Sequence, residues 1–426
     1  MEPLDRPRGF ARSLFASLHY RDNRVFWIGT MISSVAQAGF LVSTSWLAFE
    51  MVGSSAVGLV TFATMFPFLL ATPVGGLLAD RLDRRSIVLV SQVVQASVAL
   101  LLGLLALLDV LPLGLLLALV LVSGIARTIE LPTVGAVLPN LVPPRELLNN
   151  LSLNSLATLG SRFVGPALLA PVLAIGGAGP AFLLITLAYL PALAYVRQTP
   201  PMPRTQLATT GIVELVREGG RYIRERSMVS LMLGLVVAHC LLTMSFDSTL
   251  PLVADKNLRG SGAIYSSLVA AGGIGAIVGS LWLAGLRRVA RRGVLLLGSG
   301  ILSGASTAAM ASSEVWVIAA VSMVAAGLSQ AMFMTLATTL VQEAVPDALR
   351  GRVVGLFLMS AGGVMSFGNL ANGYLAEQFG TMRILGIPAL AFIAVMLLTS
   401  LARPALRLVY RRGRLPDVGG VSVPVG

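Results

Sequence analysis

Uncharged stretches of about 20 residues, rich in Leu, Val, Ala and Gly, recur along the whole 426-residue chain. An α-helix rises 1.5 Å per residue, so about 20 apolar residues cross the ~30 Å hydrocarbon layer of a bilayer. Only 12% of the residues are charged, whereas soluble domains carry about 25%. A soluble core could not bury so much apolar surface, so the sequence predicts a protein that crosses the membrane many times.

The apolar stretches predict an all-α integral membrane protein with twelve transmembrane helices. Two six-helix bundles are expected at 24–198 and 228–402, joined by a cytoplasmic linker at 199–227 that contains a short amphipathic helix. Residues 1–23 are expected to form a cytoplasmic N-terminal segment, and 403–426 a basic, disordered cytoplasmic tail. The expected spans are 24–49, 56–79, 86–108, 112–136, 151–175, 179–197, 228–251, 262–285, 293–311, 315–341, 353–376 and 382–402.

The placement of the basic residues predicts the orientation in the membrane. If the N-terminus is cytoplasmic, the inside segments hold 26 of the 31 basic residues, and the outside loops hold only Lys256, Arg259 and Arg383. Cytoplasmic loops are enriched in Lys and Arg, so both termini are expected on the cytoplasmic side of the plasma (inner) membrane. The net charge of +12 is spread over these short loops, where it orients helices and does not indicate nucleic-acid binding.

The two halves of the chain repeat each other at an offset of 203 residues. Gly76 corresponds to Gly279 at this offset, and Arg84 and Arg85 correspond to Arg287 and Arg288. The shared offset predicts two six-helix pseudo-repeats. Some transporters use such repeats to build a substrate site near the bilayer midplane and to expose it to alternate sides.

Three stretches carry a family resemblance. GGLLADRLDRR at 75–85 resembles the signature loop of the major facilitator superfamily, Gly-x-x-x-Asp-Arg-x-x-Arg-Arg, and the resemblance covers the chain from about residue 20 to 402. LVQEAVPDALRGRVVGLFLMSAGG and LPNLVPPRELLNNLSLNSL resemble the branch that contains the enterobactin exporter and macrolide efflux pumps. GSRFVGPALLAPV resembles the helix-bend element in the fifth span of antiporters through Gly160, Gly165 and Pro166, without the following Gly-Gly.

The loop signature implies a cytoplasmic gate. The matching residues are Gly76, Asp80, Arg81, Arg84 and Arg85, and Asp83 replaces the usual glycine before the basic pair. The resemblance implies that Asp80 pairs with an Arg across the junction between the halves while the inner side is closed. The alternative is that the three Arg only orient the helix. The second half has Leu283 at the position equivalent to Asp80, so the acid distinguishes this loop from an orientation signal.

Ionisable residues within the spans are candidates for proton coupling. A charge at the centre of a span costs ~2.5–3.5 kcal/mol on insertion scales and therefore faces a cavity or a partner. Arg127 and Glu130 stand three residues apart on one helix face, close enough to pair; a self-satisfied structural pair is the alternative. Asp247 and His239 lie on a similar face of the seventh span, and either can carry a proton, although packing is the simpler role for His239.

Polar and soft residues in the first, fourth, seventh and tenth spans are candidates for the substrate cavity, because the resemblance places these spans around it. They are Gln37, Trp46, Thr128, Thr243, Gln330, Met332, Phe333 and Met334. Packing or lipid contact is the alternative for each. The sequence has no P-loop, metal-ligand cluster or nucleophile constellation, so we expect neither an enzyme nor a bound cofactor.

These features favour a monomeric secondary active transporter that exports an amphiphilic organic compound, drug-like or siderophore-like, by alternating access. Protons are the expected driving force, because the chain contains no ATP-binding motif. One alternative is an importer or facilitator with the same fold. Another is a transporter-like membrane sensor or scaffold that binds a partner through the 199–227 linker or the basic tail.

Overall fold

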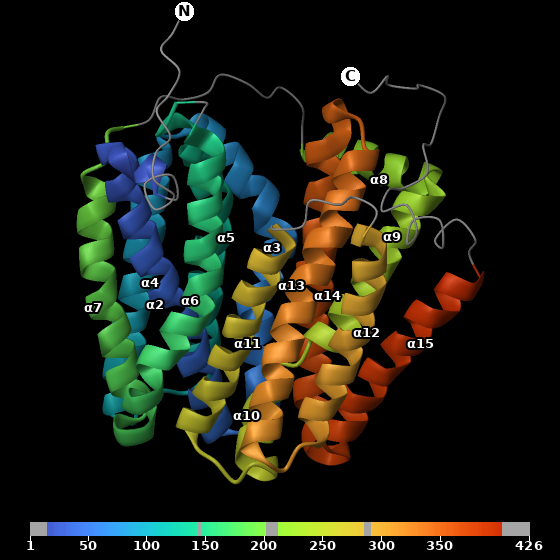
Figure 1. Ribbon diagram of the computed structural model, residues 1–426. Coiled ribbons are helices and arrows are strands. Elements are labelled where there is room, and N and C mark those ends of the chain that lie inside the picture. Colours follow the sequence, from blue (N-terminus) through green and yellow to red (C-terminus); the bar gives the residue numbers. More distant parts are fainter. Residues whose placement is uncertain (1–14, 144–145, 202–211, 285–290, 403–426) are drawn as a thin grey trace, which may run out of the picture. The chain divides into compact units, whose positions relative to one another are not determined.

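The computed structural model describes residues 15–143, 146–201, 212–284 and 291–402, and in α3 it describes side chains as far as Leu69. Every element in these ranges is helical (Figure 1). The first helices are α2 (Arg21–Met51), α3 (Ser54–Arg81), α4 (Arg84–Leu107), α5 (Leu113–Val137), α6 (Leu147–Gly176) and α7 (Ala178–Arg197). The later ones are α8 (Ile212–Glu225), α9 (Ser227–His239), α11 (Gly262–Ala284), α12 (Arg291–Ser312), α13 (Trp316–Ala344), α14 (Asp347–Phe379) and α15 (Ile387–Ala402).

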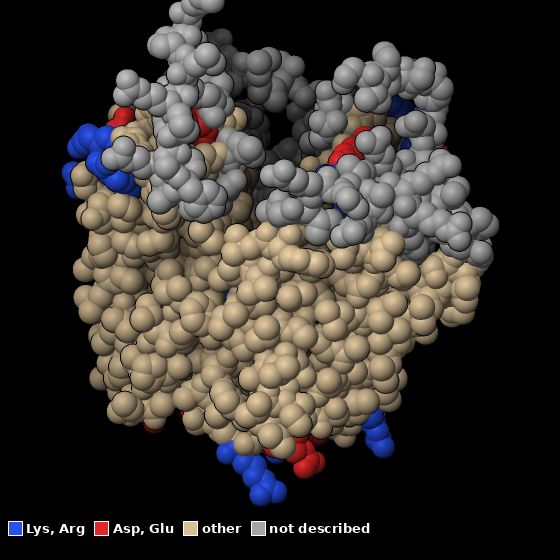
Figure 2. Space-filling view, in the orientation of Figure 1, with Lys and Arg blue, Asp and Glu red and all other residues tan. Residues whose placement is uncertain are grey.

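The helices confirm an all-α membrane protein. Among the described residues, 11 helices are long and apolar enough to cross a bilayer. The predicted span at 56–79 falls in α3, whose described apolar part is Ser54–Leu69. A broad band of the visible surface lacks charged side chains (Figure 2), as expected for the surface that faces lipid.

The chain forms two compact units that divide two of its helices. Unit 1 contains residues 1–43 and 70–208, and unit 2 contains residues 44–69 and 209–426. The division falls after Ser43 in α2 and after Leu69 in α3, so the hairpin of these two helices packs with the second half of the chain.

Unit 1 is held together by apolar packing at one end and by close helix crossings. Phe26, Val88 and Val196 belong to one buried cluster that joins α2, α4 and α7. Gly165 in α6 lies against α2, where an added methyl group would overlap the Val35 carbonyl and approach Gly39. Because only glycine permits this approach, Gly165 serves helix packing.

In unit 2, glycines bring α11 and α13 into direct backbone contact. A methyl group at Gly275 would overlap the Val324 carbonyl, and one at Gly279 would overlap the Leu328 carbonyl. Gly327 approaches the Gly272 carbonyl in the same way. Small residues at such crossings are the usual means of close helix packing in membranes.

The predicted seventh span at 228–251 is not one continuous helix. The α-helix α9 ends at His239 and passes into a π-helical turn at Cys240–Met244. Residues 245–249 form turns, and the chain then continues through the short α10 (Leu250–Leu252) and a second π-helical segment, Val253–Asn257. Asp247 therefore lies in an interruption of the span and not on a regular helix.

The linker contains the expected short helix, α8. Its last turns pack on unit 2, where Ile223 belongs to the buried cluster and the Tyr222 hydroxyl donates to the Ala344 carbonyl at 3.3 Å. The position of α8 on the cytoplasmic face stays a prediction.

Candidate functional site

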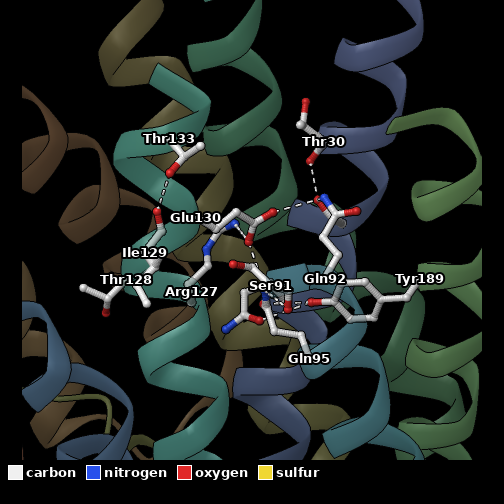
Figure 3. A network of polar contacts seen from close by, with 12 residues as sticks. Thr30, Ser91, Gln92, Gln95, Arg127, Thr128, Ile129, Glu130, Thr133 and Tyr189 are labelled. Atoms are coloured by element: carbon white, nitrogen blue, oxygen red, sulfur yellow. Dashed lines mark hydrogen bonds and ion pairs between the residues drawn. The ribbon is translucent and has the colours of Figure 1, made fainter. Parts of the chain in front are cut away.

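A buried carboxylate lies at the centre of a polar network in unit 1. Figure 3 shows Glu130 of α5 beside Arg127 on the same helix and beside Gln92 and Gln95 of α4. Its oxygens accept hydrogen bonds from Gln92 Nε2 at 3.1 Å, Gln95 Nε2 at 2.9 Å and Arg127 at 3.0 Å. The side chain of Glu130 is 1% exposed and that of Arg127 is 14% exposed. The sequence prediction that these two charges pair is confirmed.

The network extends to two further helices. Tyr189 of α7 donates its hydroxyl proton to Gln95 Oε1 at 3.1 Å, with Gln37 Oε1 of α2 as a second acceptor at 3.3 Å. Gln92 Nε2 also donates to the Ser33 hydroxyl of α2 at 3.1 Å. Four helices thus contribute side chains to one buried site, and the carboxylate has a donor for each oxygen, as a buried charge requires.

Sequence reasoning found Arg127, Glu130 and Gln37 but missed four members of this network: Ser33, Gln92, Gln95 and Tyr189. A signal for two of them was present. Gln92 and Gln95 stand three residues apart in the otherwise apolar stretch SIVLVSQVVQASVALLL, which places two amides on one face of a membrane helix. Tyr189 gives no comparable pattern. Thr128 is buried, and its hydroxyl donates to the Gly124 carbonyl of its own helix at 2.8 Å.

A second polar cluster lies in unit 2 around His239. The ring lies between Phe333 and Phe392, with centroid distances of 4.2 and 5.1 Å. Its Nε2 is 3.0 Å from the hydroxyl of Ser303 on α12. The residue is fully buried, so the structure gives His239 the packed environment that the sequence favoured.

The same cluster contains two other predicted cavity residues. The Thr243 hydroxyl donates to the His239 carbonyl at 2.7 Å, and Gln330 Nε2 donates to the Thr243 carbonyl at 3.2 Å. Since Thr243 lies in the π-helical turn, these bonds help to compensate its altered backbone pairing. Met332 is buried, and Met334 packs against the cluster of apolar side chains that includes Phe333.

Asp247 lies near an aromatic pair in unit 2. Trp46 of α2 stacks on Tyr265 of α11 with ring centroids 5.9 Å apart, and it donates to Glu50 at 2.8 Å. The Tyr265 hydroxyl shares a hydrogen bond with Ser45 and lies within electrostatic range of Asp247. Trp46 is therefore packed against α11, and its role in a substrate cavity stays a prediction.

The basic pair of the signature loop binds the ends of two other helices in unit 1. Arg84 donates to the Ala136 carbonyl in the last turn of α5 at 2.8 Å, and Arg85 donates to the Arg197 carbonyl at the end of α7 at 2.6 Å. Guanidinium groups at helix C-termini satisfy orphan carbonyls and oppose the negative end of the helix dipole. This geometry shows that both residues join helices within unit 1.

Asp83 has its own structural role. It caps the start of α4, where its carboxylate accepts from the Ser86 backbone at 3.0 Å and from the Ser86 hydroxyl at 2.6 Å. The residue that departs from the family pattern thus replaces a glycine turn with a helix N-cap. Gly76, Asp80 and Arg81 lie outside the residues whose side chains the structure describes, so the gate stays a prediction.

We expect Arg84→Ala to lower the free energy of unfolding by ~1.5–3 kcal/mol, because the charged donor to the α5 carbonyl is lost from a buried position. The exposed Arg221→Ala on α8, outside the predicted spans, is the control and should change it by less than ~0.5 kcal/mol. Thermal unfolding of the purified variants measures both. Equal stability of the two variants would show that the Arg84 bond contributes nothing.

The proposed helix-bend element lies in α6. Gly165 makes the crossing with α2, Pro166 is inside the helix, and no atom lies within 4 Å of a methyl group placed at Gly160. Packing thus accounts for Gly165, and a bending role for the three residues stays a prediction.

Several known proteins are similar in sequence to most of this chain. Macrolide efflux protein A of Streptococcus pyogenes is 23% identical over 366 residues, which cover 83% of this chain and 89% of that protein. Enterobactin exporter EntS of Escherichia coli is 28% identical over 312 residues, covering 71% and 72%. Staphyloferrin A transporter of Staphylococcus aureus is 22% identical over 397 residues, covering 90% and 95%.

Solved structures show the same fold. The nucleoside transporter NupG matches with a TM-score of 0.71 at 12% identity, over 91% of this chain and 99% of that chain. A POT family transporter in complex with 5-aminolevulinic acid matches with a TM-score of 0.69 at 13% identity, over 91% and 96%.

The family and its relatives are transporters and not enzymes, and the apolar helices make the chain a multi-pass protein of the cell membrane. The family model described as Transmembrane secretion effector matches residues 12–408. Because this match covers nearly the full length of the chain, the chain belongs to the transmembrane secretion effector family of the major facilitator superfamily.

Proposed function

We propose that the protein is a monomeric, proton-coupled exporter of an amphiphilic organic compound and that it works by alternating access. In this proposal the chain crosses the membrane twelve times, and both of its termini lie in the cytoplasm. Its relatives include a macrolide efflux protein and siderophore transporters, which supports an amphiphilic cargo. An importer with the same fold would have the same architecture, so the direction of transport distinguishes the importer from the exporter.

The buried pair of Arg127 and Glu130 is the observation that carries the proposal. Ionisable residues inside a membrane are expensive and therefore mark substrate or proton pathways by default. This pair lies in the interior of unit 1. Gln92 and Gln95 of α4 donate to Glu130, and Ser33 of α2 accepts a hydrogen bond from Gln92. The alternative is a self-satisfied structural pair, which would have the same hydrogen bonds, so transport by variants without the two charges has to separate the two roles.

The geometry suggests how a proton changes the site. When Glu130 is ionised, it accepts hydrogen bonds from Arg127 and from two amides. A proton on the carboxyl would convert one acceptor into a donor and remove the charge that neutralises Arg127. The Arg127 guanidinium would then need another hydrogen-bond acceptor. Proton binding is therefore linked to the arrangement of α4, α5 and α7.

Asp247 is the second coupling group in the proposal. It lies in the interruption of the seventh span, in the turns at residues 245–249. Interrupted helices expose backbone dipoles and side chains at the sites where transporters bind ions and substrates. We assign His239, enclosed by Phe333 and Phe392, to packing and not to proton transfer.

A growth-inhibition panel tests the function. Cells with and without the gene are compared across macrolides, other amphiphilic drugs and siderophores. Cells that carry the Asp247→Asn variant, which we expect to be inactive, control for expression. The proposal expects the gene to raise tolerance to at least one amphiphile and to lower its cellular accumulation. Gene-dependent sensitisation with higher accumulation would instead establish import, and no effect on any compound would leave the sensor as the better account.

A further inference from the structure

The interruption of the seventh span leaves backbone groups without helical partners, and α14 supplies them. Residues 245–249 form turns in a largely buried stretch of unit 2, where backbone N–H and C=O groups need hydrogen-bond partners. The Ser248 N–H donates to Asn369 Oδ1 at 3.0 Å, and Asn372 Nδ2 donates to the Ser245 carbonyl at 2.6 Å. The two asparagines stand three residues apart and so share one face of α14.

The two asparagines bind backbone groups on either side of Asp247 in the sequence. Asn369 holds the residue after Asp247, and Asn372 holds the residue two positions before it. Asn369 is fully buried and is itself fixed by a bond from its Nδ2 to the Met365 carbonyl at 3.0 Å. At Gly368 an added methyl group would overlap the Ser245 side chain, so α14 and the interruption are in direct contact.

The same segment of α14 also touches the beginning of α3. A methyl group at Gly373 would overlap the Ser54 carbonyl and approach Gly58. One turn further, Glu377 accepts from the Ser54 N–H at 2.6 Å, which places a carboxylate at the N-terminus of α3. Residues 368–377 of α14 thus contact both the Asp247 turn and the beginning of α3 in the α2–α3 hairpin.

We propose that Asn369 and Asn372 are positioning residues for Asp247, and that through them residues 368–377 of α14 couple Asp247 to the α2–α3 hairpin. The inference rests on the coupling role of Asp247 in the proposed function. Movement of the hairpin against α14 alters the hydrogen bonds that hold the Asp247 turn. A conformational change at Asp247 is transmitted to the hairpin by the same contacts. The asparagines themselves carry no proton.

The chain provides its own reporter for this turn. Cys240 is the only cysteine, is fully buried, and its carbonyl accepts from the Ser245 hydroxyl at 2.8 Å. Opening of the turn should expose the Cys240 thiol to N-ethylmaleimide. Asn372→Leu and Asn372→Asp both remove the donor and keep the number and branching of the side-chain heavy atoms. Ser366→Ala is the matched control because, among the described residues, its buried hydroxyl donates to the Gly363 carbonyl of its own helix.

We expect both Asn372 variants of the purified full-length protein to be alkylated at Cys240 about tenfold faster than the parent, because the Ser245 carbonyl loses its partner. Ser366→Ala should stay within about twofold. A second reporter, Ala337→Cys in a Cys240→Ala background, lies in the same apolar cluster as Cys240 and should show no change. Acceleration at both reporters would mean general loosening and would overturn the proposal, as would unchanged labelling of Cys240.

A spectroscopic measurement tests the position of residue 247 directly. A nitroxide on Asp247→Cys, in the Cys240→Ala background, should give an immobilised spectrum that becomes mobile when Asn369→Leu or Asn372→Leu is added. A spectrum unchanged by both substitutions would show that the asparagines do not position residue 247. Neither measurement requires transport, so failure of the export proposal would leave both results interpretable.

Discussion

Replacing Glu130 by alanine is expected to lower the free energy of unfolding by ~3–5 kcal/mol and to abolish export. The substitution leaves the Arg127 guanidinium, 14% exposed, as a buried charge without its carboxylate. It also removes the acceptor of Gln92 and Gln95. Denaturation of the purified protein and accumulation of the identified compound in cells measure the two effects. Thr133→Val is the matched control on α5, because among the described residues its buried hydroxyl donates to the Ile129 carbonyl of its own helix.

A double substitution separates structure from function at this pair. Arg127→Leu with Glu130→Met removes both charges, and apolar replacement of a buried ion pair is often neutral for stability. We expect this variant to regain most of the stability lost in Glu130→Ala but to show no export driven by a pH gradient. Proton-driven export by the double variant would show that the pair is structural only.

Asp247→Asn is expected to abolish export driven by a pH gradient, while the protein still reaches the membrane in normal amount. The amide has the shape of the carboxyl group but cannot take up or release a proton near neutral pH. Export in cells, with membrane content measured by immunoblot, provides the test.

The exposed Asp255→Asn, in the second π-helical segment of the same unit, is the control for Asp247→Asn and should export normally. Normal export by Asp247→Asn would remove Asp247 from the mechanism and leave Glu130 as the coupling group.

The spans were predictable from the sequence because each apolar helix satisfies its own backbone and shows its length in the hydropathy. The interruption at 245–249 was not predictable. Its backbone groups are paired by Asn369 and Asn372, more than 120 residues later, and hydropathy contains no information about such partners. A polar residue in a span is visible in the sequence, whereas the backbone group that it supports is not.

The site was predictable where both partners lie on one helix. Arg127 and Glu130 are three residues apart, so helix geometry alone brings them together. The contacts of Tyr189 with Gln95 and of Arg84 with Ala136 join separate helices, and their geometry depends on how those helices pack. For the same reason the sequence did not show that Arg84 and Arg85 bind helix ends within unit 1, and their part in a gate stays a prediction.

The most direct test of the central claim is transport in inside-out membrane vesicles. Vesicles with an acidic interior are given the compound that shows the largest gene-dependent change in growth inhibition, and its uptake is followed as the pH gradient is imposed and then collapsed. Proton-coupled export predicts gene-dependent accumulation inside the vesicles that requires the gradient and is absent in Asp247→Asn. Accumulation that is independent of the gradient, or gradient-driven movement out of the vesicles, would contradict the account.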